Sequence, residues 1–251
     1  MKAELGLFQA TILGSIEGIT EFLPISSTGH LILASYLLGI EHNNFLKTFE
    51  ITIQSGAILA IVFLYWQKLI KSFKLLLAGF LPTAIVGFLL YRPIKDYLIG
   101  SDIIVVFSSI IGGFLLILLD RYTPQQGKEP GVKEAMLIGL FQSVAFIPGV
   151  SRSGACFAGG LILGLGRKES AEFSFLLAVP TVLAASIYDL FKSVDSFNII
   201  HWQIMLLGFI SALVFAFLGI KLMLIFANKN ALSIFGTYRI LIGAIYGFLF
   251  I

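Results

Sequence analysis

The chain has 251 residues, of which 58% are hydrophobic and only 12% charged, and its mean hydropathy is +0.97. Soluble domains are about half apolar and a quarter charged, so this composition excludes an ordinary soluble domain and indicates an integral membrane protein. The net charge of +3 comes from basic residues that lie mostly in short loops, which excludes the concentrated basic surface that binds nucleic acid.

The first apolar region, residues 5–40, is broken in its middle by the polar stretch EGITEFLPISSTGH. A broken helix at membrane depth is tolerated only where protein or a water-filled cavity covers the freed backbone groups. This region is therefore predicted to be a re-entrant helix-turn-helix hairpin. Glu17 and Glu21 are four residues apart and share one face of its first half-helix.

Two carboxylates so close together repel each other, and at low dielectric constant one of them takes up a proton unless a cation lies between them. We expect Glu17 and Glu21 to hold a hard divalent metal ion, Mg²⁺ or Ca²⁺, that bridges to a phosphate. The alternative is a pair of interfacial glutamates near the end of a short helix. The functional interpretation is favoured because ionisable residues at membrane depth are usually functional.

The second half-helix of this hairpin starts with Ser26, Ser27 and Thr28. Hydroxyl residues at a helix start are ordinary N-caps, and we expect at least one of the three to have only that role. Ser27 lies three residues before His30, which places a hydroxyl and an imidazole on one helix face. Such a pair is a minimal activated nucleophile, although the histidine could also attack phosphorus or protonate a leaving group.

Six full membrane spans and a second broken region are predicted after the first hairpin. The spans are residues 50–67, 74–91, 102–120, 171–191, 203–227 and 234–251, and the second broken region is 135–166. Its break, IPGVSRSG, contains Arg152, whose planar guanidinium suits phosphate oxygens and whose placement in a membrane costs roughly 2.5 to 3.5 kcal/mol. The structural alternative is a salt bridge from Arg152 to Glu17 or Glu21.

The two broken regions resemble each other. A shift of 125 residues places Gly14 on Gly139, Glu17 on Gln142, Ser26 on Ser151 and Thr28 on Ser153. Three spans follow each hairpin, so the second unit is predicted to be inverted relative to the first. The predicted fold is one all-α polytopic membrane domain, residues 1–251, built as an inverted-topology repeat with units at about 1–125 and 130–251.

In such a repeat the two broken tips enter from opposite faces and meet near the membrane midplane. Two half-helix N-termini that face one cavity make an anion site, for which phosphate is the expected ligand. The residues expected to bind substrate there are Arg152, Ser151, Ser153, Ser26, Thr28 and Gly154.

Lysine and arginine are unevenly shared between the two predicted membrane faces. The richer face carries Lys68, Lys71, Lys74, Arg121, Lys128, Lys133, Arg167, Lys168 and Lys229. Because cytoplasmic loops carry an excess of basic residues, both termini and the mouth of the first hairpin are predicted to face outward. Glu50, Glu172 and Arg239 lie near span ends and are interpreted as snorkelling groups.

The motif EGITEFLPISSTGHLIL, together with PGVSRSG, closely resembles the bacitracin-resistance type of undecaprenyl-diphosphate phosphatase, and the resemblance covers the whole chain in length and layout. It implies an enzyme of the bacterial plasma (inner) membrane that removes the terminal phosphate of undecaprenyl diphosphate. That reaction regenerates the lipid carrier used in cell-wall synthesis. The resemblance also implies dependence on a divalent metal ion, and resistance to bacitracin.

By motif position, the resemblance implies roles for individual residues. Glu17 and Glu21 would be the acidic pair, Ser27 and His30 the catalytic hydroxyl and imidazole, and Arg152, Ser151 and Ser153 the diphosphate clamp. Cys156 stands where the family usually has threonine, and a thiol is the weaker hydrogen-bond donor. A substrate contact at that position is therefore in doubt.

The rival function is a lipid-phosphate transporter or flippase, because inverted repeats with broken helices are also transporter architecture. Transport of an anion needs helix dipoles and Arg152, but it has no need for Ser27 beside His30 and paired glutamates. The cluster therefore favours the enzyme. The expected partners are a polyprenyl diphosphate and membrane lipids, and a homodimer is left open.

Overall fold

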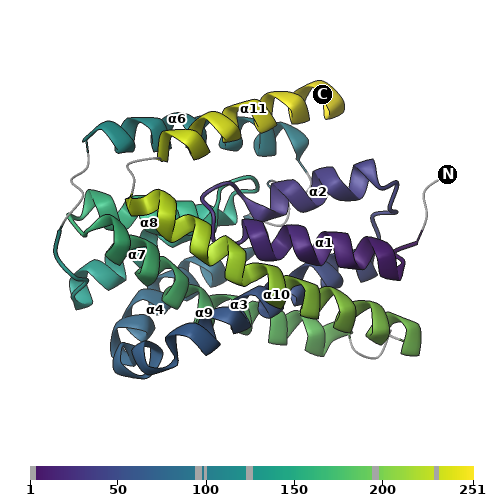
Figure 1. Cartoon of the computed structure of the whole chain (residues 1–251), viewed down its shortest axis with the longest axis horizontal. Helices are drawn as coiled ribbons and strands as arrows, with labels where there is room; N and C mark the ends of the chain where they lie inside the picture. Colours follow the sequence, from purple (N-terminus) through teal and green to yellow (C-terminus); the bar gives the residue numbers. More distant parts are fainter. Residues whose placement is uncertain (1–3, 94–97, 99–100, 123–126, 194–197, 229–231) are drawn as a thin grey trace.

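The computed structural model describes residues 4–93, 98, 101–122, 127–193, 198–228 and 232–251, and these fold into a bundle of helices (Figure 1). The first half of the chain contains α1 Leu7–Thr20, α2 Ser27–Leu37, α3 Asn44–Lys71, α4 Phe73–Leu89, α5 Tyr91–Pro93 and α6 Asp102–Tyr122. The second half contains α7 Val132–Ser143, a 3₁₀ turn at Val144–Phe146, α8 Arg152–Ile162, α9 Arg167–Ser193, α10 Ile199–Asn228 and α11 Leu232–Phe250.

The helices have the length and surface of membrane-spanning segments, which confirms the prediction of an all-α polytopic membrane protein. Five of them are long and apolar enough to cross a bilayer: Asn44–Lys71, Asp102–Arg121, Arg167–Lys192, Ile199–Ala227 and Leu232–Phe250. The remaining predicted span corresponds to α4, whose 17 residues reach the lower limit for a crossing of about 30 Å. Phe88, Phe191 and Phe248 are each more than 80% exposed on the outside of the bundle, where lipid tails would cover them.

Both predicted helix breaks are present. The first separates α1 from α2 around Pro24, and Ser26 caps α2 with a backbone φ of 69°, a value that a residue with a Cβ rarely adopts. The second separates α7 from α8, with Gly149 at φ 86°. The pair α1–α2 lies toward one end of the bundle and α7–α8 toward the other, so that their breaks meet at its centre (Figure 1).

Helix contacts follow the pattern that the predicted inverted repeat requires. In the predicted repeat, α7 corresponds to α1 and α4 corresponds to α10. Helix α1 packs against α10, and in the same way α7 packs against α4. At both crossings a glycine allows the two backbones to approach each other closely. A Cβ on Gly14 would overlap the Gly208 carbonyl oxygen, and a Cβ on Gly139 would overlap the Gly79 carbonyl oxygen. The repeat itself, with its units of about 1–125 and 130–251, stays a prediction that this pairing supports.

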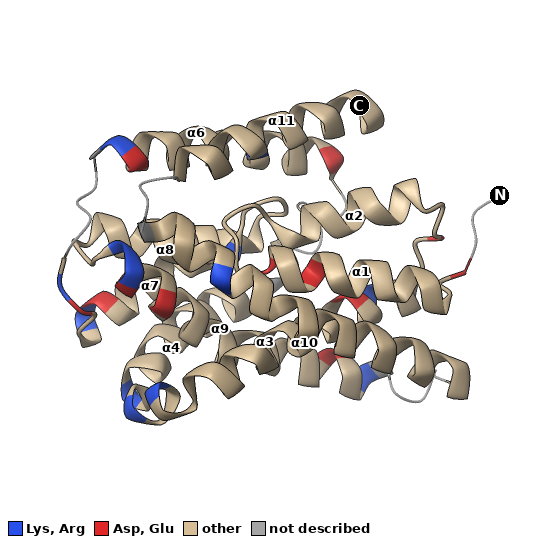
Figure 2. Ribbon diagram, in the orientation of Figure 1, with Lys and Arg blue, Asp and Glu red and all other residues tan. Residues whose placement is uncertain are grey.

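Charged residues are segregated along the bundle (Figure 2). Lysine and arginine gather mainly at the end where α3 meets α4 and α6 ends, while the start of α1 and the end of α11 lie at the opposite end. A smaller group of charges lies at the centre, beside the two helix breaks. The central charges therefore include those that the sequence places in the hairpins, Glu17, Glu21 and Arg152.

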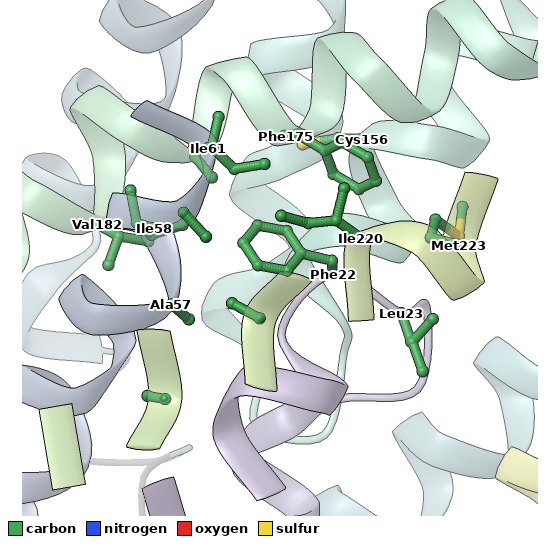
Figure 3. Packing of buried hydrophobic residues seen from close by; sticks show 14 of the residues in the cluster. Phe22, Leu23, Ala57, Ile58, Ile61, Cys156, Phe175, Val182, Ile220 and Met223 are labelled. Atoms are coloured by element: carbon green, nitrogen blue, oxygen red, sulfur yellow. The ribbon is translucent and has the colours of Figure 1, made fainter. Parts of the chain in front are cut away.

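Buried apolar side chains enclose the first break (Figure 3). Phe22 in the break packs edge-to-face on Phe175 of α9, with ring centroids 5.3 Å apart, and Ile220 and Met223 of α10 lie beside it. Phe22 and Phe175 are fully buried. The irregular backbone between α1 and α2 is thus covered by protein, which satisfies the condition for a helix break at membrane depth.

Candidate active site

An ion pair joins the two helix breaks. Arg152, the first residue of α8, donates from Nε and Nη2 to Oε1 of Glu21 at 3.3 and 3.0 Å, and its Nη1 donates to the Ser174 carbonyl at 2.9 Å. Ser27, the first residue of α2, donates from Oγ to the other carboxylate oxygen of Glu21 at 2.7 Å. The structural alternative for Arg152, a salt bridge to Glu17 or Glu21, therefore exists with Glu21, and it places a guanidinium, a carboxylate and a hydroxyl within contact distance.

A polar cavity of about 170 Å³ lies between the breaks. Its lining residues are Glu21, Ser26, Ser27, Thr28, Gln54, Ala145, Val150, Ser151, Arg152 and Val182. Since a water molecule occupies about 30 Å³ in the liquid, the cavity has room for a small polyatomic anion. Four of the residues predicted to bind substrate line it together: Ser26, Thr28, Ser151 and Arg152.

The N-termini of two half-helices flank this cavity. The Ser26 side chain accepts a hydrogen bond from Gly29 N in α2, and Ser151 accepts one from Gly154 N in α8. These serines act as the N-caps that helix starts require, so they leave the positive ends of both helix dipoles beside the cavity. Backbone N–H groups and a guanidinium at one cavity form a site suited to phosphate.

Two other predicted substrate-binding residues do not line the polar cavity. Ser153 donates to the Leu23 carbonyl at 2.8 Å, and Ser151 reaches the same oxygen at 3.3 Å, so these hydroxyls tie the second break to the first. Gly154 lies against the Pro24 ring, where a Cβ would be 3.3 Å from the ring Cβ. The structure thus places Ser153 where its hydroxyl ties the second break to the first, and Gly154 where it packs closely against the first break.

Glu17 is fully buried one helical turn before Glu21, and neither of its carboxylate oxygens has a hydrogen-bond partner. A buried carboxylate without a partner is costly, so the position requires either a proton or a cation. Within the part of the chain that the structure describes, no group of three or more His, Cys, Asp or Glu side chains could hold a metal ion. Two carboxylates nevertheless fit Mg²⁺, which is commonly held by one or two carboxylates, substrate phosphates and water.

His30 is not in the cavity and is not the partner of Ser27. Its Nδ1 lies 2.8 Å from the Ser26 carbonyl oxygen, and its Nε2 lies 2.7 Å from the hydroxyl of Tyr238 in α11. The sequence correctly places Ser27 and His30 at the start of one helix, but the hydroxyl turns inward to Glu21 and the imidazole turns toward α11. In the described structure the proton acceptor next to Ser27 is therefore a carboxylate.

The interpretation of Arg239 as a snorkelling residue is wrong. Its side chain is buried and donates to the carbonyls of Pro24 and Gly149, one from each helix break, at 3.1 and 2.9 Å. It also donates to the carbonyls of Ser108 and Ser109 in α6. The available signal was its position, because Arg239 lies in the interior of an apolar helix and not at its end.

An apolar groove of about 750 Å³ adjoins the polar cavity. Its wall from α6 includes Phe107, Ile111 and Leu115, and its opposite wall includes Ala155, Ala158 and Ile162 of α8. Val150 and Ser151 line both the groove and the polar cavity. An amphiphile with an anionic head and a long apolar tail matches this combination.

The sequence is similar to known proteins over nearly its whole length. The model of the family described as bacitracin resistance protein BacA matches residues 10–245. Undecaprenyl-diphosphatases similar to this chain occur in Aquifex aeolicus, at 51% identity over 97% of this chain and 98% of that protein, and in Sulfurihydrogenibium sp., at 48% over 95% and 97%. A further undecaprenyl-diphosphatase, from Thermus thermophilus, is 44% identical over 97% of each chain.

Proposed function

The chain belongs to the bacitracin resistance protein BacA family, and we propose that it hydrolyses undecaprenyl diphosphate to undecaprenyl phosphate and phosphate in the cavity between its two helix breaks. The observation that carries this proposal is the contact of Ser27 and Arg152 with the two oxygens of Glu21 inside that cavity. The reaction recycles the lipid carrier for cell-wall synthesis, and it confers resistance to bacitracin.

Head-group binding follows from the charges at the cavity. Arg152 and the N-termini of α2 and α8 bring positive charge to the position where the diphosphate oxygens would lie. Because Glu21 already neutralises Arg152, the partly buried guanidinium is stable before substrate arrives. An incoming diphosphate then competes with Glu21 for the guanidinium, which frees the carboxylate to accept a proton.

The geometry supports Ser27 as the nucleophile and Glu21 as its base. As the Ser27 oxygen attacks the terminal phosphorus, its proton passes to the Glu21 carboxylate 2.7 Å away, and the bond from phosphorus to the bridging oxygen breaks. Undecaprenyl phosphate leaves, and water then attacks the phosphorylated serine. The bond from phosphorus to the Ser27 oxygen breaks, that oxygen takes back the proton from Glu21, and the proton that water loses leaves with the phosphate. The leaving group is a phosphate monoester, so positioning and electrostatic stabilisation carry more of the rate than acid catalysis.

Glu17 and Glu21 would hold the divalent metal ion that the family resemblance implies. Bound there, Mg²⁺ or Ca²⁺ would add positive charge at the phosphate oxygens. The unpartnered carboxylate of Glu17 supports this assignment, because a cation would supply the missing partner.

The apolar groove suits the polyprenyl tail. A chain that starts at the shared residues Val150 and Ser151 and runs between α6 and α8 stays among apolar side chains out to the lipid. The diphosphate can thus reach the cavity without the tail leaving an apolar environment.

The enzyme is proposed to lie in the bacterial plasma (inner) membrane with both termini outward. The gathering of lysine and arginine at the end opposite the start of α1 supports this orientation (Figure 2). The mouth of the first hairpin would then open outward, and a homodimer stays a prediction.

Phosphate release from a long-chain prenyl diphosphate by detergent-purified protein tests the function. We expect release by the wild type, loss of release on addition of EDTA, and strongly reduced release by Ser27→Ala and Arg152→Ala proteins that still fold. A well-folded wild type that releases no phosphate with any divalent metal ion would contradict the phosphatase. That result would favour the rival function, transport of a lipid phosphate through the same cavity.

A further inference from the structure

Both ring nitrogens of His30 are engaged by groups outside the polar cavity. Nδ1 lies 2.8 Å from the Ser26 carbonyl oxygen, and Nε2 lies 2.7 Å from the Tyr238 hydroxyl, which belongs to a helix 208 residues away in sequence. The two rings are also nearly parallel, with an interplanar angle of 9° and centroids 5.5 Å apart. The contacts of both ring nitrogens and the stacked Tyr238 ring therefore fix the imidazole in one orientation.

The identity of the partners determines which nitrogen carries the proton. A backbone carbonyl oxygen can only accept, so Nδ1 of His30 must carry a hydrogen. In a neutral imidazole the other nitrogen is then an acceptor, and the hydroxyl of Tyr238 donates to it. The pair thus selects a neutral ring with a hydrogen on Nδ1 and a lone pair on Nε2.

The position of Tyr238 is itself held by the next residue. Arg239 donates to the carbonyls of Pro24 and Gly149, which fixes α11 against both helix breaks. Tyr238, the preceding residue, is therefore held at a fixed position beside α2. The same guanidinium is the cation near the imidazole, so a neutral ring also avoids a repulsion between two positive charges.

We propose that Tyr238 is a positioning residue for the phosphatase reaction, which holds His30 as a neutral imidazole with a proton-accepting Nε2. This inference rests on the proposed function. When a water molecule replaces the Tyr238 hydroxyl at Nε2, it can donate a hydrogen bond to the lone pair there. His30 is tied through the Ser26 carbonyl to a residue that lines the cavity, so the ring lies behind the cavity wall at a fixed position.

The protonation site can be measured by ¹⁵N NMR of histidine-labelled protein in detergent or nanodiscs. The chain has three histidines, and the His30 signals are assigned by their loss in His30→Gln. We expect the wild type to carry its hydrogen on Nδ1. Tyr238→Phe keeps the ring stack and removes only the donor. The Ser26 carbonyl still holds the Nδ1 hydrogen, so we expect the Nε2 chemical shift to change as that nitrogen loses its hydrogen bond. We also expect kcat to fall about tenfold, at the low end of the losses seen when partners that orient metal-bound histidines are removed.

Tyr246→Phe is the matched control. Tyr246 lies two turns further along α11, and its hydroxyl is also hydrogen-bonded, to Asp102 at 2.8 Å. We expect this variant to leave the His30 signals and kcat unchanged. Loss of a hydrogen-bonded tyrosine hydroxyl from α11 would then change the His30 signals and kcat only where that hydroxyl contacts His30.

Two results would overturn the proposal: a wild type with its hydrogen on Nε2, or a Tyr238→Phe protein with unchanged NMR signals and unchanged kcat. The first needs no Tyr238 variant, so a folding defect in Tyr238→Phe does not prevent the test. A wild type without phosphatase activity would contradict the proposed function alone, because the NMR measurement needs no turnover.

Discussion

One carboxylate at the site serves two partners. Glu21 accepts a hydrogen bond from Ser27 at one oxygen and pairs with Arg152 at the other, and its side chain is only 7% exposed. A buried guanidinium and a buried carboxylate stabilise each other only while both are present. The arrangement is therefore sensitive to removal of the negative charge.

Glu21→Gln is predicted to lower kcat roughly 100-fold, because the amide cannot take the proton of Ser27 and positioned bases contribute factors of that order. The measurement is steady-state phosphate release at saturating substrate. Glu172→Gln is the control, since that carboxylate pairs with Lys68 and Lys168 away from the cavity. Equal kcat values for Glu21→Gln and the wild type would exclude Glu21 as the base.

At the element scale, each half of the site is the start of a short helix held against a long one. Helix α2 begins at Ser27 and α8 at Arg152, and α11 fastens both breaks through Arg239. The groove that leads to the cavity lies between α6 and α8. Access for the lipid tail thus depends on the small residues that α8 presents to α6.

Ala158→Trp is predicted to fill part of the groove and to raise KM for a long-chain prenyl diphosphate several-fold. The KM for a short-chain prenyl diphosphate should change little, because its head group reaches the cavity without occupying the groove. Steady-state kinetics with both substrates separate the two effects. An equal change in KM for both would mean that the substitution disturbs the cavity and that the groove does not hold the tail.

At the scale of the whole molecule, the chain orients its basic end away from its termini (Figure 2). Cys156, the single native cysteine, is buried, so an introduced cysteine can be labelled selectively. We predict that a membrane-impermeant maleimide added to intact cells labels Glu4→Cys, and that it labels Lys71→Cys only after permeabilisation. Both positions are exposed, and the reverse pattern would invert the orientation.

Much of the architecture could be predicted from local sequence. Hydropathy located the six apolar spans. It predicted a span at 50–67, whereas α3 runs from Asn44 to Lys71. The prediction is shorter than the helix because only the lipid-facing middle of a span must be apolar. The charges in the two breaks also indicated, as one alternative, a salt bridge of Arg152 to Glu17 or Glu21, and it forms with Glu21. Those residues are informative because a charge at membrane depth needs a partner.

Contacts between distant helices could not be predicted in the same way. Nothing in the local pattern around His30 indicates that its ring turns from Ser27 toward Tyr238 in α11, since the pairing depends on how α11 packs. The role of Arg239 was missed for the same reason, because its four carbonyl partners come from three separate segments. Side-chain direction at a helix start is set by tertiary contacts, which a single sequence does not contain.

The most direct test of the central claim is to trap the phosphorylated enzyme. Wild-type protein would be mixed with long-chain prenyl diphosphate carrying a radiolabelled terminal phosphate, quenched within a turnover under conditions that preserve phosphohistidine, and mapped by mass spectrometry. We expect label on Ser27 that is absent in Ser27→Ala. Label on His30 would contradict it, and would make the imidazole the nucleophile.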